Sequence, residues 1–297
     1  SRIVAKKLNL PIVHTYHTLY EDYVHYVTHG HFNNLAKKLA IKITKYYCEK
    51  KCDELIVPTD KIKDLFINKY NISQPINVIP TGIDIDKFKL TPNIKKEIVS
   101  IKKKYKIKDT DFIIGSVGRI APEKSFDKLL YNIKEMIKVN TNIKVMLVGG
   151  GPDLDNLKEL SKKLHLEDYV IFTDKVNYDL VPAYFNAFNV IVSFSKTETQ
   201  GLTIIEGLAA SKPTICIEDD SFKAMIEPNY NGYLFKNDNE FKDYIFKLMN
   251  DKKLYKDMST NARNSTYKYS KEVFASEVLK VYHKAIEKKS NSKKIED

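Results

Sequence analysis

Two glutamates flank a stretch of sequence that predicts a phosphate-binding turn. An apolar run from Val190 to Phe194 ends in polar residues, and Gly201 then permits a tight turn before a short apolar helix. A helix start presents unpaired backbone N–H groups and the positive end of the helix dipole, which suits a phosphate or a diphosphate. Glu198 precedes the turn and Glu206 lies one turn into the helix, so the two carboxylates could hold opposite ends of one extended ligand.

The chemistry of these carboxylates narrows the choice of ligand. A carboxylate accepts two hydrogen bonds from a pair of neighbouring hydroxyls, such as those of a sugar ring. Glu206 therefore suits a ribose and Glu198 suits the hydroxyls of a hexose, with the phosphates between them. The implied ligand is a sugar nucleotide. Without these surroundings, two glutamates at this spacing would more often be solvated side chains.

A pair of cations follows another apolar run. Residues 112–117 predict a buried parallel strand, Gly118 lets the backbone turn, and a helix is expected from about residue 125. Arg119 and Lys124 then lie at the carboxyl end of the strand, where two fixed cations could neutralise a diphosphate leaving group. On these residues alone, two ordinary surface charges would be the simpler interpretation.

These motifs together resemble a known enzyme family. Seven residues separate Glu198 from Glu206, and the surrounding sequence resembles the E-x7-E motif of the retaining glycosyltransferases of family 4, which have the GT-B fold. Arg119 and Lys124 resemble the R-x4-K phosphate clamp of the same family. The resemblance implies a UDP-sugar donor, with both cations and Glu198 at the reacting end and Glu206 on the ribose.

The resemblance also implies backbone contacts to the donor. The nucleobase would contact the loop Thr173–Val176, through the backbone of Val176. The diphosphate would contact the backbone of Gly201, Leu202 and Thr203. Because fixed cations already face the leaving group, we expect no metal ion and no other cofactor to be required.

Five of the seven histidines lie between residues 14 and 31. Residues 11–13 predict a strand, which places His14 and His17 beyond its carboxyl end, where open α/β sheets bind ligands. The string His-Thr-Tyr-His-Thr, followed by Tyr-Glu-Asp-Tyr, resembles the bacterial diacylglycerol glucosyltransferases within family 4. In that group His17 would lie near the transferred sugar, and His14 would orient it. The alternative for His17 is a hydrogen-bonded core histidine.

Two further patterns resemble metal sites, and we interpret neither as one. His25 and His29 have the i, i+4 spacing of helical metal ligands but lack an accompanying glutamate. Asp84 and Asp86 form a D-x-D pattern. Their segment, however, resembles the interdomain crossing of family 4, in which the first aspartate is structural.

Alternating strand and helix signals predict an α/β fold with two doubly wound, Rossmann-like domains. We expect residues 1–88 to form an N-terminal acceptor and membrane-side domain that lacks its first strands. Residues 89–270 are expected to form the nucleotide-sugar-binding domain. The resemblance to the GT-B fold implies that a helix at 271–289 crosses back to the first domain. Residues 290–297 are polar and charged, which predicts a disordered tail.

Composition and charge limit the partners. The chain has 297 residues, of which 43% are hydrophobic, and a formal net charge of +11. This charge favours an anionic partner such as a phosphorylated substrate or an acidic membrane, although a solvated basic surface would also explain it. Nucleic acid is disfavoured because the basic residues do not alternate with stacking aromatics. No apolar run is long enough to span a membrane, so any membrane contact would be peripheral.

Residues 32–51 predict one amphipathic helix. Lysines border its apolar stripe, as in a helix that lies on an anionic membrane. An ordinary helix packed on a sheet would show the same pattern, so both interpretations stay open. The stripe consists of Phe32, Leu35, Ala36, Leu39, Ile43, Tyr46 and Tyr47.

The resemblance implies one reaction above others. It is the retaining transfer of glucose from UDP-glucose to 1,2-diacylglycerol at the cytoplasmic face of a bacterial membrane, by front-face attack without a covalent enzyme intermediate. A soluble sugar, a thiol or a growing glycan is the alternative acceptor, and an inactive nucleotide-binding fragment is a further alternative. The choice between UDP-glucose and UDP-galactose depends on the neighbours of one hydroxyl and stays open.

Overall fold

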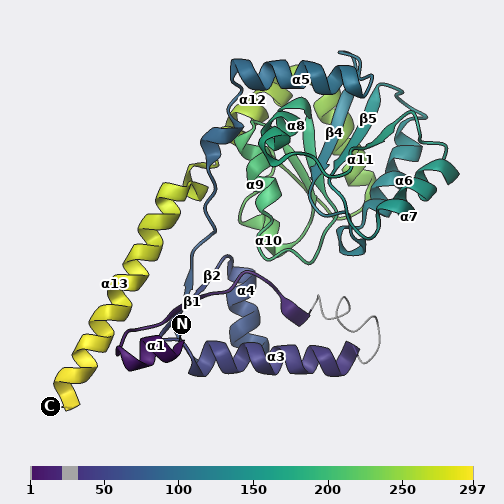
Figure 1. Cartoon of the computed structure of the whole chain (residues 1–297). Coiled ribbons are helices and arrows are strands. Elements are labelled where there is room, and N and C mark those ends of the chain that lie inside the picture. Colours follow the sequence, from purple (N-terminus) through teal and green to yellow (C-terminus); the bar gives the residue numbers. More distant parts are fainter. Residues whose placement is uncertain (1, 22–32, 297) are drawn as a thin grey trace. The chain divides into compact units, whose positions relative to one another are not determined.

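The computed structural model describes residues 2–21 and 33–296. The chain divides into two compact units (Figure 1), one made of Ser1–Gly82 with Lys271–Asp297 and the other of Ile83–Ser270. The sequence placed this boundary after residue 88 instead. Residues 83–88 belong to the second unit because Phe88 is buried in its core and Asp86 forms an ion pair with Arg263.

The second unit is built on a parallel sheet with the strand order β6-β5-β4-β7-β8-β9. The strands are mostly buried, as expected for a sheet with helices on both faces. The strand order reverses between β4 and β7, so the loops after these two strands border the crevice where doubly wound sheets bind ligands. The strands are β4 Phe112–Val117, β5 Ile143–Val148, β6 Val170–Phe172, β7 Val190–Ser193, β8 Thr214–Ile217 and β9 Gly232–Phe235.

The helices of the second unit alternate with its strands (Figure 1). In α6, for example, Leu129, Leu130 and Ile133 are fully buried. Apolar residues spaced three to four positions apart form one face of the helix, and this face packs into the core. The helices are α5 Pro92–Lys104, α6 Phe126–Met136, α7 Leu154–Lys163, α8 Val181–Ala187, α9 Leu202–Ala209, α10 Asp220–Lys223, α11 Asp238–Asn250 and α12 Lys252–Asn264.

The first unit has a smaller parallel sheet with the order β1-β2-β3 among the described residues. The central strand packs on both faces. Leu55 and Val57 join one hydrophobic cluster, whereas Ile56 points to the other face and packs with Val281 of α13. The predicted α/β fold class is therefore confirmed. The elements are α1 Arg2–Lys7, β1 Val13–Thr15, α3 Asn33–Lys50, β2 Glu54–Val57, α4 Asp60–Asp64, β3 Ile76–Val78 and α13 Lys271–Glu296.

Two predicted boundaries in this unit were wrong. The first strand is Val13–Thr15 and not residues 11–13, because its pairing with β2 runs from Val13–Glu54 to Thr15–Ile56. His14 therefore lies inside the strand. The predicted disordered tail from residue 290 is helical as far as Glu296, since no glycine or proline after Lys271 interrupts α13.

The helix α3 does not pack through its apolar stripe. Its buried residues are Thr44 and Cys48, on another face of the helix. Leu35, Leu39, Ile43, Tyr46 and Tyr47, called here the exposed stripe, have exposed fractions between 49% and 67%. The interpretation of a helix packed through this stripe is wrong for these residues.

Helices within residues 2–21 and 33–296 do not combine the length and apolar character that a membrane crossing requires.

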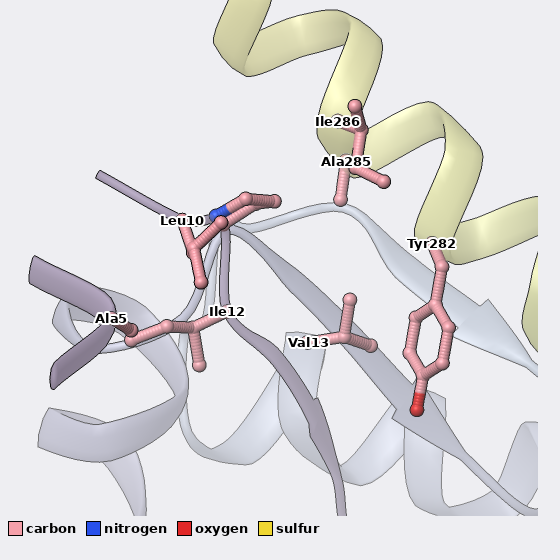
Figure 2. A pocket seen from close by; sticks show the side chains of 8 residues that line it. Ala5, Leu10, Ile12, Val13, Tyr282, Ala285 and Ile286 are labelled. Carbon is pink, nitrogen blue, oxygen red and sulfur yellow. The ribbon is translucent and has the colours of Figure 1, made fainter. Parts of the chain in front are cut away.

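A hollow of about 510 Å³ lies between α1, β1 and α13 (Figure 2). Ala5, Leu10 and Val13 line it from the N-terminal segment, and Tyr282 and Ile286 line it from α13. The residues that line the hollow are apolar apart from the hydroxyl of Tyr282. The hollow is therefore suited to apolar packing rather than to catalysis.

Candidate functional site

The two loops that follow β4 and β5 are joined by backbone hydrogen bonds, and we call them the platform that carries Arg119. The backbone N–H of Gly118 donates to the carbonyl of Val148 at 2.9 Å. A Cβ on Gly149 would lie 1.9 Å from the carbonyl oxygen of Gly118, so only glycine permits this close approach. Arg119 is exposed on this platform at the carboxyl end of β4, as predicted from the sequence.

Lys124 and Glu198 meet although 74 positions separate them in the sequence. The Nζ of Lys124 donates to Oε1 of Glu198, and the two side chains are only 25% and 20% exposed. In this partly desolvated position, the attraction between the charges exceeds that of a surface pair. The structure thus brings together a predicted diphosphate cation and the predicted hexose-binding acid.

The start of α9 adjoins the same platform. Gly201 has a φ of 85°, in the left-handed region, and a Cβ there would lie 2.8 Å from the ring of Phe222. Gly201 has no side chain that could cap α9, and a helix start of this kind presents backbone N–H groups that suit an anionic ligand. A Cβ placed on Gly118 would lie 4.0 Å from Cγ2 of Thr203, which shows how closely the two loops approach.

Glu206 points into a cavity of about 260 Å³ within the second unit. Burial raises the pKa of this carboxyl to about 7. The Nζ of Lys87 lies 5.6 Å from the centroid of the Tyr178 ring at the same cavity. The cavity therefore combines a carboxylate, a cation and an aromatic ring. Its lining residues include Lys87, Phe88, Ile94, Tyr178, Asp179, Val181, Pro182 and Glu206.

Sequence reasoning missed Lys87 and Tyr178. Lys87 lies in the segment that the sequence assigned to an interdomain crossing, and nothing in its local pattern marked it. Tyr178 had a usable signal, because it follows Val176 by two positions in the loop predicted to hold a base. Val176 itself lies in the loop after β6 and is partly buried against the core of the second unit.

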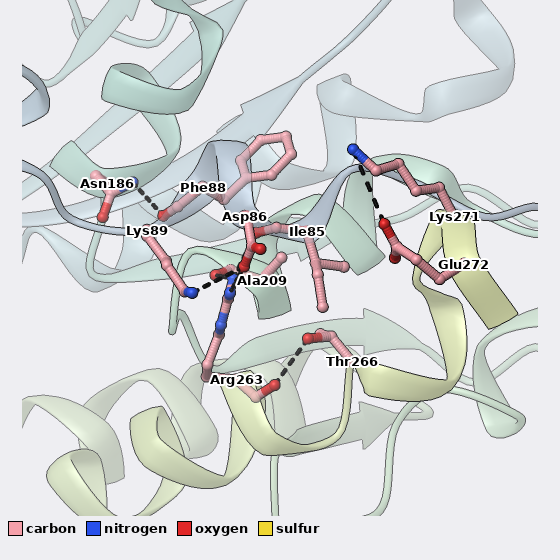
Figure 3. A network of polar contacts seen from close by, with 10 residues as sticks. All are labelled: Ile85, Asp86, Phe88, Lys89, Asn186, Ala209, Arg263, Thr266, Lys271 and Glu272. Carbon is pink, nitrogen blue, oxygen red and sulfur yellow. Dashed lines mark hydrogen bonds and ion pairs between the residues drawn. The ribbon is translucent and has the colours of Figure 1, made fainter.

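The carboxylate of Asp86, the second aspartate of the D-x-D pattern, contacts two basic side chains (Figure 3). One guanidinium nitrogen of Arg263 donates to Asp86 at 3.0 Å, and Lys89 pairs with the same carboxylate at 2.9 Å. The other nitrogen of Arg263 donates to the carbonyls of Ile85 and Ala209 at 2.6 and 2.7 Å. The pair His25 and His29 lies outside the described residues.

His14 and His17, both in the first unit, lie close to each other. His17 is exposed, so the alternative of a buried core histidine is wrong for it. Its Nδ1 lies 3.4 Å from Oγ1 of Thr81. His14 is half-buried, and its pKa is lowered by burial and, to a lesser extent, by the charge of His17. His17 belongs to the first unit and the other predicted site residues belong to the second.

Sequence comparison relates both units to known enzymes. The family described as Glycosyl transferases group 1 matches residues 97–265, and the family described as Glycosyltransferase Family 4 matches residues 1–87. The chain is 36% identical over 295 residues to the alpha-monoglucosyldiacylglycerol synthase of Acholeplasma laidlawii, covering 98% of this chain and 73% of the relative. It is 32% identical over 247 residues to the synthase of the same name from Streptococcus pneumoniae, covering 83% of this chain and 55% of that relative.

Solved structures share the fold. HepE of Anabaena in complex with UDP-glucose has a TM-score of 0.74 at 18% identity, covering 98% of this chain and 75% of that one. Sucrose-phosphate synthase of Thermosynechococcus elongatus has a TM-score of 0.79 at 19% identity, covering 96% of this chain and 71% of that one. Family models match both units, and one relative is 36% identical over 98% of this chain. The chain therefore belongs to glycosyltransferase family 4 and is a sugar transferase of the GT-B fold.

Proposed function

We propose that this enzyme transfers glucose from UDP-glucose to 1,2-diacylglycerol with retention of configuration, forming an α-glucosyl diacylglycerol. The observation that carries this proposal is the 36% identity, over 98% of this chain, to a relative named alpha-monoglucosyldiacylglycerol synthase. A second relative at 32% identity has the same name. The UDP-glucose bound by HepE, a protein of the same fold, supports the choice of donor.

Positively charged side chains stabilise the diphosphate of the leaving group. When the bond between C1 of glucose and UDP breaks, negative charge develops on the β-phosphate. Arg119 and Lys124 offset this charge, and the backbone N–H groups at Gly201, Leu202 and Thr203 donate to the phosphates. The donor's own charge is thus balanced by the protein, and we propose that no metal or other cofactor is required.

The two glutamates hold the two sugar rings of the donor. Glu198 accepts hydrogen bonds from the glucose hydroxyls, and its ion pair with Lys124 fixes both groups before the donor arrives. Glu206 accepts from the ribose hydroxyls, and the backbone of Val176 contacts the base. Tyr178 adds an aromatic face at the Glu206 cavity, which suits the nucleoside end of the donor.

The acceptor hydroxyl attacks C1 on the face from which UDP departs, without a covalent enzyme intermediate. We propose that His17 lies near the transferred sugar, as the resemblance to the diacylglycerol glucosyltransferases implies. The imidazole is exposed, and its Nδ1 lies 3.4 Å from Oγ1 of Thr81. We propose that His14 orients this histidine.

The helix α3 supports a lipid acceptor. Its exposed stripe would insert between lipid headgroups, and exposed lysines on the same helix would contact anionic lipids. Each lysine near an anionic surface contributes about 1 kcal/mol of attraction. We therefore propose that the enzyme works peripherally at the cytoplasmic face of the membrane. The lysines are Lys37, Lys38, Lys42, Lys45 and Lys50.

The test is glucosyl transfer by the full-length enzyme and its Arg119→Ala and Glu198→Ala variants. UDP-glucose and UDP-galactose are offered together with vesicles that contain diacylglycerol, and the lipid products are identified by mass spectrometry. We expect glucosyl diacylglycerol from the wild type and a loss of about 100-fold or more in kcat for each variant. Lys128→Ala, an exposed cation on α6, is the control and keeps its activity.

Wild-type rates in either variant would contradict the assigned roles. Product formation that is indifferent to vesicles, with a soluble sugar or thiol as the preferred acceptor, would replace diacylglycerol in the proposal. Binding of UDP without any product would reduce the chain to a nucleotide-binding protein.

A further inference from the structure

The first unit contains a second, apolar cavity of about 440 Å³ between the segment after β1 and the helix α3. Its walls are aromatic rings and short apolar side chains rather than charged groups. Such a lining favours a hydrocarbon over a polar ligand. The walls include Tyr16, Tyr20, Ala40, Ile43, Tyr47 and Cys48.

The inner wall of this cavity is held in place by core packing. Tyr16 is only 2% exposed, and its ring contacts Phe66 edge-on with the centroids 4.7 Å apart. Cys48 is fully buried in the same hydrophobic cluster. A ligand would therefore meet a preformed surface, and binding would not require the core to rearrange.

The outer wall belongs to the exposed stripe of α3. Ile43 and Tyr47 line the cavity, and they are also 50% and 53% exposed. If α3 lies on the membrane, this edge of the cavity faces the lipid. A hydrocarbon chain could then leave the bilayer and enter the cavity without crossing water, which avoids the cost of exposing it.

Two polar residues, His14 and Thr44, also line the cavity. His14 lines it, and the charge of His17 reaches His14, which shows that the two imidazoles are neighbours. His17 in turn lies 3.4 Å from the hydroxyl of Thr81. Imidazoles and a hydroxyl beside an apolar cavity suit a molecule with a hydroxyl head and a hydrocarbon tail.

We propose that this cavity holds one acyl chain of the lipid acceptor, with the glycerol hydroxyl directed toward His17. The inference rests on the proposed transfer to diacylglycerol and adds the site that recognises the acceptor tail. Acceptor affinity then depends on chain length, because each buried methylene changes it by about fourfold until the cavity is filled.

The experiment compares two phenylalanine variants of the first unit. Ala40→Phe places a ring in the cavity, whereas Ile67→Phe enlarges an exposed apolar residue after α4 that belongs neither to the cavity lining nor to the exposed stripe. Diacylglycerols of increasing chain length are the acceptors. Binding of the fluorescent polyene cis-parinaric acid is measured separately, without UDP-glucose. UDP binding is followed by calorimetry as a check on the second unit.

We expect Ala40→Phe to raise the KM for long-chain acceptors tenfold or more, to flatten the chain-length dependence and to weaken parinaric acid binding by a similar factor. Ile67→Phe should match the wild type, and UDP binding should be unchanged in both. Tyr47→Ala removes an exposed wall residue and serves if Ala40→Phe does not fold; we expect it to weaken parinaric acid binding at least threefold.

The failures can be told apart. If diacylglycerol is glucosylated and Ala40→Phe behaves like Ile67→Phe in all assays, the cavity is not the acyl-chain site and the proposed reaction stands. If parinaric acid binds and Ala40→Phe or Tyr47→Ala weakens this binding, but no variant or wild type glucosylates diacylglycerol, the cavity is a hydrocarbon site and the proposed reaction is wrong.

Discussion

Replacing Glu206 by glutamine removes a carboxyl whose pKa burial raises from 4.5 to about 7. Between these two values, the folded protein keeps a proton on Glu206 that the unfolded chain releases. The contribution of Glu206 to the free energy of unfolding of the wild type therefore falls as the pH rises from 4.5 to about 7, and it levels off above that pH. Glutamine carries no charge at any of these pH values, so the variant lacks this loss.

The size of the effect follows from the pKa shift. A shift of this kind corresponds to about 3 kcal/mol if the site were fully shielded from water. Glu206 is half-buried, so solvent screens part of its charge. We expect Glu206→Gln to raise the free energy of unfolding by about 1 to 3 kcal/mol at about pH 8 and to leave it nearly unchanged at about pH 4.

The assay is urea unfolding of the ligand-free protein, followed by circular dichroism at about pH 4, 6 and 8. Glu159→Gln is the matched control, because Glu159 is exposed on α7 and its replacement should have little effect at any pH. A stability difference between Glu206→Gln and wild type that is the same at all three pH values would refute the argument from burial.

The affinity for UDP should fall in Glu206→Gln, although the free energy of unfolding rises. Glutamine cannot accept both ribose hydroxyls as a carboxylate does, so we expect calorimetry to show an affinity for UDP about tenfold lower. One variant would then be more stable and bind worse, as expected where a functional group is buried at a cost in stability.

Three further predictions test other parts of the molecule. Gly201→Ala should lower the free energy of unfolding by about 1 to 3 kcal/mol and weaken UDP binding, because its φ is 85° and Phe222 occupies the space of a Cβ; equal urea midpoints for variant and wild type would contradict this. Lys284→Ala should destabilise the first unit by about 1 to 2 kcal/mol, measured by hydrogen exchange in β2 and α13, because it removes a partner 3.1 Å from the fully buried Glu54 while Lys288 stays 3.9 Å away. The same change in a Glu54→Gln background should cost much less, and an equal cost would show that the charge pair is unimportant. Leu39→Glu should reduce binding to anionic vesicles about tenfold in a sedimentation assay, whereas Leu90→Glu, which changes a similarly exposed leucine of the second unit, should not; equal losses would remove α3 from the membrane contact.

Local patterns were sufficient for much of the second unit. The apolar run before Arg119 and the run before Glu198 predicted β4 and β7 because buried parallel strands need continuous apolar sequence. Gly201 marked the turn into α9 because its positive φ excludes most other residues. The family resemblance followed from the residues at these turns, and the sequence relatives confirmed it.

Contacts between distant segments could not be predicted in this way. The register of β1 depends on its hydrogen bonds to β2, and this register moved His14 from a loop into the strand. The apolar period of α3 was visible, but which face packs depends on the surface it meets, and the exposed stripe stayed outside the core. The spacing of apolar residues predicts a helix and its apolar face. Which face is buried also depends on the surface that the helix packs against.

The sequence by itself determined the family, the fold class and the order of the turns after β4 and β7, because each depends on residues that are neighbours along the chain. Only the tertiary structure decided that Lys124 pairs with Glu198 and that Glu206 shares a cavity with Lys87 and Tyr178. The physical reason is that ion pairs, desolvation and cavity shape arise where segments far apart in sequence exclude water together.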